Sequence, residues 1–480
     1  MRETKKTLII RDEIHGDMSF DPVLRFVVDH RYFQRLRYIK QLGLAEFVFP
    51  CATHTRFQHS LGASYLAGEY YRHFLKGWLT TRFDFEQSCG NTKFYTQRTF
   101  ERVLEVSQDR DSHDFWGRVV RLAGMLHDIG HGPWSHTFEV LELPQDFSSV
   151  VDKMPGACGD YYRKMAKSGT RFMHEDISVL YAFQIFSELG VSGNQTPYFL
   201  PVAVLIHRKL LSSSVGEEIK KEVQQTLAQL KIKGGLDFLS LLGPFISGPF
   251  DVDRMDYIQR DGRNCGVPVG GIEWRRIVGR LMPCLADHPN DKGEPTSVVL
   301  VSKMKNQHVL DDFIFSLFQM YTQVYLHPKI VGLEESLKKV IAEKKNKLKT
   351  RSISFDQYAG FSDESFRRFL IEVLDAPEID RLLLREQGAT FRVTTLPADF
   401  GRESELQEMG YHSIENANRP MMKDGLGVFL FSKLPTSKPE SHSVGQYLLM
   451  SWEEVSPVAK EFYSIKYAPK IWLHAEASVV

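Results

Sequence analysis

The chain has 480 residues, 60 basic and 60 acidic side chains, a formal net charge of zero and 42% hydrophobic residues. These values are typical of a globular protein with a sizeable core, and they exclude a disordered or fibrous chain. The neutral balance argues against a dedicated nucleic-acid-binding protein, although a local basic groove for nucleic acid is not excluded.

The five cysteines, at positions 51, 89, 158, 265 and 284, have no paired spacing. They therefore indicate neither a disulfide framework nor a cysteine-based zinc site. The opening stretch MRETKKTLIIRDEIHGD lacks the apolar core of a signal peptide, and no run of about 18 apolar residues occurs. We expect a cytoplasmic protein that does not associate with membranes.

Helical patterns dominate the first two thirds of the chain. The segment DPVLRFVVD (21–29) offers Asp21 as a cap and Pro22 at the first helical position. A helix over 31–43 follows, and then one over 55–79, whose apolar spacing places His59 on or beside its buried face. Further helices are expected at 116–127, 134–142, 174–189, 197–212, 216–231 and 307–347.

Two polar stretches, about 81–114 and 143–173, are predicted to be irregular excursions from this helical core. After about residue 350 the pattern changes. One helix is expected at 362–375, whereas 389–396, 427–433 and 470–476 have the β-branched and aromatic bias of strands. We therefore predict a mainly α protein, with a helical core over 1–348 and a smaller α+β region over 349–480 that serves regulation or oligomerisation.

The segment HDIGHGPWSH (127–136) ends an apolar helix with two good ligands for a divalent metal, His127 and Asp128. The glycines and proline that follow supply the turn that lets both side chains face one ion. His59 and Asp253 are the natural additional ligands. A single such residue on an apolar face is more often a hydrogen-bonded core group, but a whole cluster of this kind is costly to bury unpaired.

Six sequence blocks follow one another along the chain: DEIHGDM, FQRLRYIKQLG, FVFPCATHTRFQHSLGASYLAGEY, MLHDIGHGPWSH, MHEDISVL and DVDRMDYIQRDGRNCGV. Together they resemble the HD phosphohydrolase superfamily. Within it they are most similar to the deoxynucleoside triphosphate (dNTP) triphosphohydrolases, especially the catalytic core of the mammalian enzymes that combine a sterile-alpha motif with an HD domain. The resemblance covers about residues 8–330, and no sterile-alpha-motif domain is expected ahead of it.

The resemblance implies an HD-superfamily helical core that holds one divalent metal ion, Mn, Fe, Mg or Zn, and hydrolyses a dNTP to deoxynucleoside and inorganic triphosphate. The implied metal ligands are His59, His127, Asp128 and Asp253. Such an ion can polarise a phosphate and activate water. A general acid must then protonate the leaving 5′-oxygen. His136 is the first candidate for this role, with His131 as the alternative and His174 in support.

The resemblance also assigns the groups that contact substrate. Arg56 is expected to neutralise charge on the phosphate, since guanidinium is a planar bidentate donor. The remaining positions are Arg254 and Tyr257 at the outer phosphates, Gln41 and Asp261 at the 3′-hydroxyl, Leu42 and Tyr257 against the 2′ carbon, and Tyr325 at the base. A site packed against a missing hydroxyl selects deoxyribose.

The sequence departs from the family pattern at three places. Leu317 falls where the mammalian enzymes have a phosphate-binding arginine, and Leu326 replaces a glutamine near the base. Gln58 replaces the glutamate before His59, which we expect to alter a hydrogen bond behind the metal ligand. The sequence therefore leaves open which residues bind the triphosphate and which base is preferred.

The resemblance further implies a nucleotide effector and a homo-oligomer, dimer or tetramer. Asp29, Gln34 and Arg37 match guanine-reading positions, with Gln34 and Arg37 expected on neighbouring turns of one helix. Arg11 stands where the family has asparagine. Lys303 and Lys305 stand for the arginine and lysine that bind a second nucleotide.

Two alternatives from other classes remain. The first is an HD nuclease or a phosphohydrolase of other nucleotides, which would use the same ligands without a wall at the 2′ position. The second is a catalytically silent nucleotide sensor that binds a partner, although the intact ligand set argues against it. A regulatory protein partner could also gate an active enzyme.

Overall fold

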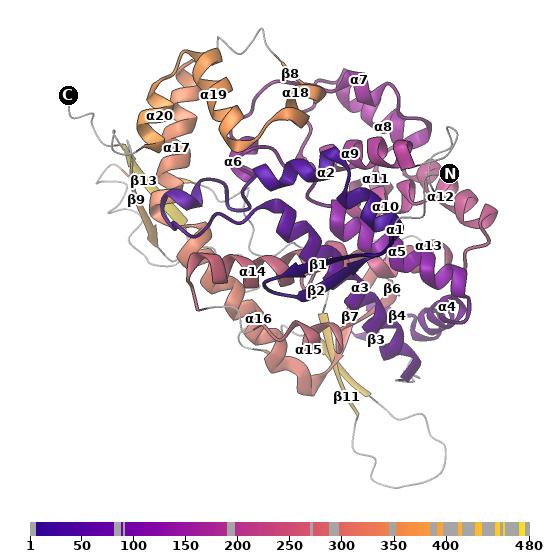
Figure 1. Ribbon diagram of the computed structural model, residues 1–480. Coiled ribbons are helices and arrows are strands. Elements are labelled where there is room, and N and C mark those ends of the chain that lie inside the picture. Colours follow the sequence, from indigo (N-terminus) through magenta and orange to yellow (C-terminus); the bar gives the residue numbers. More distant parts are fainter. Residues whose placement is uncertain are drawn as a thin grey trace, which may run out of the picture.

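The computed structural model describes residues 6–80, 88–89, 92–189, 197–268, 272–287, 297–344, 352–384 and 455–456, together with five strands between 391 and 475. Helices form most of the molecule, and smaller sheets lie at its edges (Figure 1). The mainly α class with a smaller α+β part is confirmed. No helix in the described part of the chain is long and apolar enough to cross a membrane.

The N-terminal segment begins with an antiparallel hairpin of β1 (Leu8–Asp12) and β2 (Gly16–Phe20). Helix α1 (Pro22–Val28) starts as predicted, because the Asp21 side chain accepts hydrogen bonds from the backbone N–H groups of Val23 and Leu24. The single helix predicted over 31–43 is wrong. The structure has α2 (Arg31–Gln34), a 3₁₀ turn η1 (Arg35–Tyr38) and, after an extended break, a second 3₁₀ turn η2 (Gly43–Phe47).

The break has a physical cause in backbone pairing. Lys40 forms an antiparallel bridge with Thr55. The N–H of Arg56 donates to the Ile39 carbonyl over 2.9 Å, and the N–H of Gln41 donates to the His54 carbonyl over 3.0 Å. Residues 39–41 are therefore held against the segment that leads into the next helix.

Three helices form the centre of the core: α3 (Arg56–Thr80), α5 (Arg110–Leu126) and α14 (Val252–Cys265), with α3 packed against both others. Around them lie α4 (Thr96–Gln108), α6 (His136–Val140), α7 (Ser148–Val151), α8 (Gly156–Lys167), α9 (His174–Leu189), α10 (Phe199–Ile206), α11 (Lys209–Ser212), α12 (Gly216–Gln229), α13 (Gly235–Ile246), α15 (Trp274–Val278), η4 (Met304–Asn306), α16 (Gln307–Met320), α17 (Pro328–Glu343), α18 (Phe355–Gly360), α19 (Asp363–Leu374) and α20 (Glu378–Leu383).

The prediction of irregular structure in the two polar stretches is wrong for α4, the start of α5, α7 and α8. These segments are polar because one face of each longer helix is exposed. Helix α4 buries Val103 and Val106, and α8 buries Ala157 and Tyr162. An amphipathic helix needs only such a stripe to dock on a core.

The single long helix predicted at 307–347 is also wrong. Helix α16 ends in a π-helical turn, η5 (Tyr321–Tyr325), and α17 starts afresh at Pro328. Proline lacks the N–H that would continue the preceding helix, and it suits a first helical position. The His327 side chain caps the new helix by accepting from the N–H of Lys329.

Six strands form the largest sheet, in the order β12-β11-β7-β6-β4-β3. They are β3 (Ser88–Cys89), β4 (Thr92–Phe94), β6 (Met282–Asp287), β7 (Ser297–Lys303), β11 (Val428–Lys433) and β12 (Tyr447–Ser451). A second sheet has the order β10-β13-β9, with β9 (Phe391–Leu396), β10 (Tyr411–Ile414) and β13 (Lys470–Ala475), and β5 (Gln145–Asp146) pairs with β8 (Ile353–Ser354).

The three C-terminal strands expected from the sequence are confirmed as β9, β11 and β13. Strands β6 and β7 are missed, although the SVVLVSK sequence of β7 has the β-branched bias of a strand. Strand β11 runs parallel to β7, with Val428 opposite Leu300, so the C-terminal region extends a sheet that starts within the first 348 residues. A boundary near residue 349 stays a prediction.

Candidate active site

Four side chains from three helices converge at the centre of the molecule. His59 comes from α3, His127 and Asp128 from the end of α5, and Asp253 from the first turn of α14. One nitrogen or carboxylate oxygen of each lies within 4.8 Å of those of the others. His59 Nε2 lies 3.1 Å from Asp253 Oδ1, and His127 Nε2 lies 3.5 Å from the same atom. The structure thus brings together all four predicted ligands.

The hydrogen bonds of the two histidines fix which nitrogen faces this centre. Nδ1 of His127 donates to the Gly124 carbonyl over 2.8 Å, and Nδ1 of His59 donates to Asp256 Oδ2 over 2.9 Å. Both acceptors can only accept, so in the neutral form of each ring the lone pair lies on Nε2. Both Nε2 atoms are buried and have no hydrogen-bond partner in the described part of the protein. Two such nitrogens beside two carboxylates fit a divalent metal ion.

A buried charge network stands behind His59. Asp256 accepts from Nε2 of His15 over 2.7 Å and from two nitrogens of Arg260, each over 2.9 Å. Arg260 in turn contacts Asp12 over 2.9 Å. Burial acts to raise the pKa of Asp256, but Arg260 and the hydrogen bonds from His15 and His59 outweigh it and hold that pKa well below its usual range. The carboxylate is therefore ionised and orients His59.

Sequence reasoning missed this network, although α14 contained a signal. Asp256 follows Asp253 by three residues and precedes Arg260 by four. This spacing puts all three on one side of the helix. The contribution of His15, 241 residues away from Asp256, was not visible in any local pattern.

Arg56 is buried next to the metal ligands. Its guanidinium contacts Asp128, and its Nε donates to Ser135 Oγ over 2.8 Å. Burial acts to raise the pKa of Asp128, but His127 and Arg56 outweigh it and hold it well below its usual range. The arginine expected at the phosphate thus lies beside the centre and keeps Asp128 ionised.

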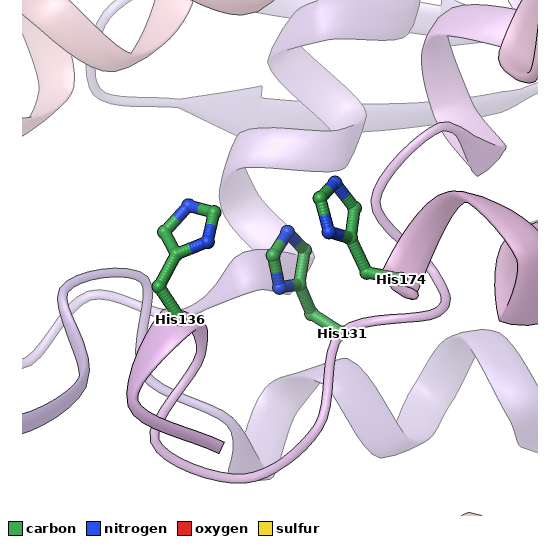
Figure 2. A group of neighbouring side chains, drawn as sticks. All are labelled: His131, His136 and His174. Carbon is green, nitrogen blue, oxygen red and sulfur yellow. The ribbon is translucent and has the colours of Figure 1, made fainter. Parts of the chain in front are cut away.

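Three histidines adjoin this centre (Figure 2): His131 on the loop after α5, His136 at the start of α6 and His174 at the start of α9. The rings of His131 and His174 are stacked, with centroids 4.0 Å apart and 15° between the ring planes. The His136 ring meets His131 edge-on, 4.7 Å between centroids. His131 Nε2 lies 3.4 Å from Asp128 Oδ1, which connects the three rings to the metal ligands.

Glu139 joins two of these histidines. It accepts from Nδ1 of His174 over 2.6 Å and from Nδ1 of His136 over 3.3 Å. The three rings also lie close enough together to hold an ion. However, the in-plane lone pairs of the two stacked rings run side by side rather than toward one point, and Glu139 occupies two of the Nδ1 atoms. This arrangement suits holding and transferring a proton better than chelation.

The electrostatics of the stacked rings differ. Burial, together with Arg56 and His174, lowers the pKa of His131 well below its usual range, which keeps it neutral. Burial acts in the same direction on His174, but the carboxylates of Glu175 and Glu139 outweigh it and raise the pKa of His174 to about 9. At neutral pH one ring of the stack is therefore neutral and the other is protonated.

The turn that carries these histidines depends on close packing. A Cβ at Gly130 would lie 2.1 Å from the His174 carbonyl oxygen. Trp134 and Ser135 both have positive φ angles, 57° and 53°, which non-glycine residues rarely adopt. The glycine in HDIGHG lets the loop approach α9, and the two strained residues aim the start of α6 at the centre.

The residues predicted to contact the sugar and the base form two groups, Gln41 with Leu42 and Asp261 with Tyr325. Gln41 is buried, and its Oε1 has no hydrogen-bond partner among the described residues. Both oxygens of Asp261 are in use, one with His54 Nε2 at 2.7 Å and the other with the Tyr325 hydroxyl at 2.8 Å. Leu42 is half-buried beside Gln41.

The residues expected at the outer phosphates, Arg254 and Tyr257, contact other parts of the protein. Arg254 is buried, and its NH1 donates to the Gly248 carbonyl at 2.7 Å and to Asp251 at 2.5 Å. Its guanidinium is thus bound to the N-terminal end of its own helix. The Tyr257 ring lies edge-on to Tyr325, 5.8 Å between centroids, so these two aromatics form one wall.

The departures from the family pattern have structural explanations. Leu317 and Leu326 are fully or almost fully buried in the core, where an apolar side chain is favoured. The expectation that Gln58 affects a hydrogen bond behind His59 finds no matching contact among the residues that the structure describes. Gln58 Oε1 instead accepts from the N–H and hydroxyl of Thr55, at 2.6 and 3.1 Å, and so caps α3.

The expected effector residues make contacts of their own within the protein. The placement of Gln34 and Arg37 on one helix is wrong, since Gln34 ends α2 and Arg37 lies in the 3₁₀ turn η1. Gln34 donates to the Val28 carbonyl at 2.6 Å and accepts from Arg37 Nε at 2.8 Å, and Asp29 pairs with Arg25. Lys303 and Lys305 are exposed, at the end of β7 and in η4.

A cavity of about 370 Å³ adjoins Arg37. Its lining includes Arg11, Asp12, Thr53 and Gln58. A second cavity of about 380 Å³ shares Arg11, Asp12, Thr53 and Gln58 and adds Glu13, His54 and Asn264. Asp12 contacts Arg260, so the wall of these cavities reaches the network behind His59.

Comparison with curated proteins finds the dNTP triphosphohydrolase SAMHD1 of Mus musculus, 38% identical over 284 residues, which cover 58% of this chain and 35% of that protein. The SAMHD1 homolog of Dictyostelium discoideum is 24% identical over 379 residues, 78% of this chain and 57% of that protein. The chain thus spans about a third to somewhat over half of the length of these relatives. An uncharacterised protein of Methanocaldococcus jannaschii is 24% identical over 461 residues, 94% of this chain and 75% of that protein.

Solved structures support the fold. A phosphohydrolase from Bacteroides thetaiotaomicron has a TM-score of 0.58 at 22% identity and covers 98% of this chain and 100% of its own. A hypothetical protein from Aquifex aeolicus has a TM-score of 0.56 at 21% identity and covers 98% of this chain and 96% of its own. No protein-family model matches the sequence. The ordered sequence blocks, the ligand geometry and several SAMHD1 relatives together support a likeness to the HD-domain dNTPases.

Proposed function

We propose that this protein is a metal-dependent hydrolase that converts dNTPs to deoxynucleoside and inorganic triphosphate. The observation that carries this proposal is the pair of buried Nε2 atoms of His59 and His127, which have no hydrogen-bond partner among the described residues and face the carboxylates of Asp128 and Asp253. Relatives named as dNTP triphosphohydrolases supply the reaction. The HD-type nuclease and the silent sensor are the competing functions.

The four ligands would hold one divalent ion. When bound, the ion supplies Lewis-acid polarisation of the phosphate and of the attacking water. Mn, Fe, Mg and Zn all accept a set of imidazole and carboxylate ligands, so the donors leave the identity of the ion open. Asp256 keeps Nδ1 of His59 protonated and thereby keeps Nε2 available.

His136 is the proposed general acid for the leaving 5′-oxygen. Its side chain is 53% exposed, whereas that of His131 is 1% exposed, so His136 is the ring that a substrate can reach. Glu139 orients His136 through Nδ1. His174 is protonated at neutral pH and donates a hydrogen bond to the same carboxylate. His131 remains the alternative acid. Arg56 would turn part of its guanidinium toward the phosphate to balance developing charge.

Substrate selection is proposed to follow the two groups of residues described above. The free Oε1 of Gln41 and the carboxylate of Asp261 would take the 3′-hydroxyl, and Leu42 with Tyr257 would exclude a 2′-hydroxyl. Arg254 would leave Asp251 for the outer phosphates, with Tyr257 beside it. Tyr325 would face the base.

An anionic nucleotide effector is proposed for the cavities lined by Arg11, because Arg37 lines the first of them as a second cation. Asp29 and Gln34 would then exchange their internal partners for a base edge, and Lys303 and Lys305 would contact a second nucleotide across a dimer or tetramer. A cytoplasmic location and a regulatory protein partner belong to the same proposal.

The direct test incubates the purified protein with Mn and an equimolar mixture of the four dNTPs, and resolves the products by chromatography. The Asp128→Ala variant is the negative control. Asp160→Ala, which removes an exposed carboxylate on α8, is the matched control. Deoxynucleosides and triphosphate from the wild type and Asp160→Ala, but not from Asp128→Ala, support the proposal. Monophosphates, cut DNA in a parallel assay, or metal binding without any product contradict it.

A further inference from the structure

Asp363, the first residue of α19, connects two distant segments of the active site. Its Oδ2 accepts from the backbone N–H of Lys40 over 2.9 Å, and its Oδ1 accepts from the backbone N–H of Trp134 over 2.8 Å. Lys40 is 323 residues away in the sequence and Trp134 is 229 residues away. The Asp363 carboxylate thus joins three parts of the chain that are far apart in the sequence.

Both segments lead directly to residues assigned above to substrate and catalysis. Lys40 precedes Gln41 and pairs with Thr55, next to Arg56. Trp134 lies two residues before His136. Any shift of Lys40 or Trp134 therefore moves the sugar contact, the phosphate arginine or the general acid.

The segment at Trp134 needs external restraint. Trp134 and Ser135 both have positive φ angles, and such residues persist where surrounding contacts over-determine them. Ser135 Oγ donates to the Lys40 carbonyl over 2.6 Å and accepts from Arg56 Nε over 2.8 Å. Asp363 completes this junction from the other side, because it binds the N–H groups of the same two segments.

Helices α18 and α19 reinforce the junction and lie beside α6 in Figure 1. The Tyr358 hydroxyl donates to the Gly130 carbonyl over 2.6 Å. The Phe366 ring packs against the Trp134 and Phe138 rings, each with 5.1 Å between centroids. The part of the chain beyond residue 330 thus supports the histidine loop at several points.

Helix capping alone does not explain Asp363. An acid in the first turn of a helix is favoured by the helix dipole, but exposed Glu364 supplies that interaction at the next position. Burial raises the pKa of Asp363 to about 6, with Lys40 and Glu46 as its charged neighbours. The carboxylate is thus kept in a site where ionisation is disfavoured, and its two backbone contacts account for its presence.

We propose that Asp363 is a positioning residue of the active site, which fastens the segment that carries Gln41 to the loop that presents His136. The inference rests on the proposed function for its kinetic consequence, but not for the contact itself. It assigns to helix α19 an indirect role in substrate hydrolysis, through the two segments that Asp363 holds.

The test compares the full-length wild type with Asp363→Ala, Asp363→Asn and Glu364→Ala. Glu364→Ala is the matched control, because it removes an acid from the same helical turn without touching either loop. Asparagine retains one carbonyl acceptor, so Asp363→Asn keeps the test available if the alanine variant does not fold. The first measurement is amide hydrogen exchange of peptides covering 38–44, 131–137 and α14, and the second is metal content with kcat and KM on a dNTP.

We expect at least tenfold faster exchange in both loop peptides of Asp363→Ala, in one of them in Asp363→Asn, and in neither of Glu364→Ala. Exchange in α14 and the metal content stay as in the wild type, and kcat of Asp363→Ala falls at least tenfold. Unchanged loop exchange, or faster exchange in α14 to the same degree, overturns the proposal. So does an altered loop with unchanged kcat. A wild type without dNTP hydrolysis instead defeats the proposed function, and the exchange result then still decides whether the contact exists.

Discussion

Nδ1 of His59 donates a hydrogen bond to Oδ2 of Asp256 over 2.9 Å, and this contact decides that Nε2 of His59 faces the other three ligands. The same carboxylate is fixed by Arg260 and His15, so it cannot turn away. The orientation of His59, a candidate metal ligand on α3, is thereby set by side chains on α14 and on the turn between β1 and β2.

We predict that Asp256→Asn lowers metal affinity by about 10- to 100-fold, the usual effect of losing a carboxylate behind a ligating histidine. The amide cannot accept hydrogen bonds from His59, Arg260 and His15 together. Titration of the metal-free protein with Mn, followed by calorimetry, measures the change. The surface substitution Asp160→Asn should leave affinity unaltered, and an equal affinity of Asp256→Asn and wild type would refute the assigned role.

A glycine pair on α3 provides a second prediction. A Cβ at Gly62 would lie 1.9 Å from Asp256 Oδ1 and 2.7 Å from Arg260, whereas a Cβ at Gly77 would meet only the side chain of Met282 at 3.0 Å or more. Gly62→Ala must displace a carboxylate held by three partners, so we expect a loss of about 1–3 kcal/mol in the free energy of unfolding. Metal affinity should fall with it.

Gly77→Ala is the matched control. The flexible Met282 side chain can yield, and alanine favours a helix by up to about 1 kcal/mol over glycine. Urea denaturation of both variants at one pH gives the comparison. Equal stability of the two alanine variants would show that the Asp256 network tolerates displacement.

The four candidate metal ligands were named from the sequence and lie together in the structure, whereas the network behind them was not predicted. His127 and Asp128 are adjacent in the sequence, and the family resemblance of the ordered blocks implies His59 and Asp253. The partners of Asp256 and of Asp363 are set by contacts between segments hundreds of residues apart, which leave no periodic pattern. Helices α4 and α8 were likewise not predicted. Their sequences are largely polar, and only a narrow stripe of buried residues packs each helix against the core.

Metal binding should stabilise the fold. The four ligand atoms converge only in the folded chain, so an ion that binds them shifts the folding equilibrium by about 2.7 kcal/mol at a hundredfold excess over its Kd. We expect Tm to rise with Mn concentration and to fall on chelation. Asp253→Asn should show a much smaller rise, and a rise equal to that of the wild type would place the ion elsewhere.

The pH dependence of stability follows from His174. Its folded pKa of about 9 lies above the ordinary value of 6.5, so the protonated ring stabilises the folded state. This contribution is fully present below pH 6.5 and is lost as the pH rises through 9. Two and a half pH units correspond to about 3 kcal/mol. We expect the free energy of unfolding, measured in urea between pH 6 and 10, to fall by up to this amount.

Two variants isolate the effect. Glu139→Gln removes one of the carboxylates that raise the pKa of His174 and leaves Glu175 and Asp128, so the fall with pH should be smaller than in the wild type. His174→Gln removes the titrating ring, so the fall assigned to it should vanish. His207 does not interfere, since burial lowers its pKa to about 4, outside this window. If the free energy of unfolding of His174→Gln fell with pH as much as that of the wild type, another group would govern stability at alkaline pH.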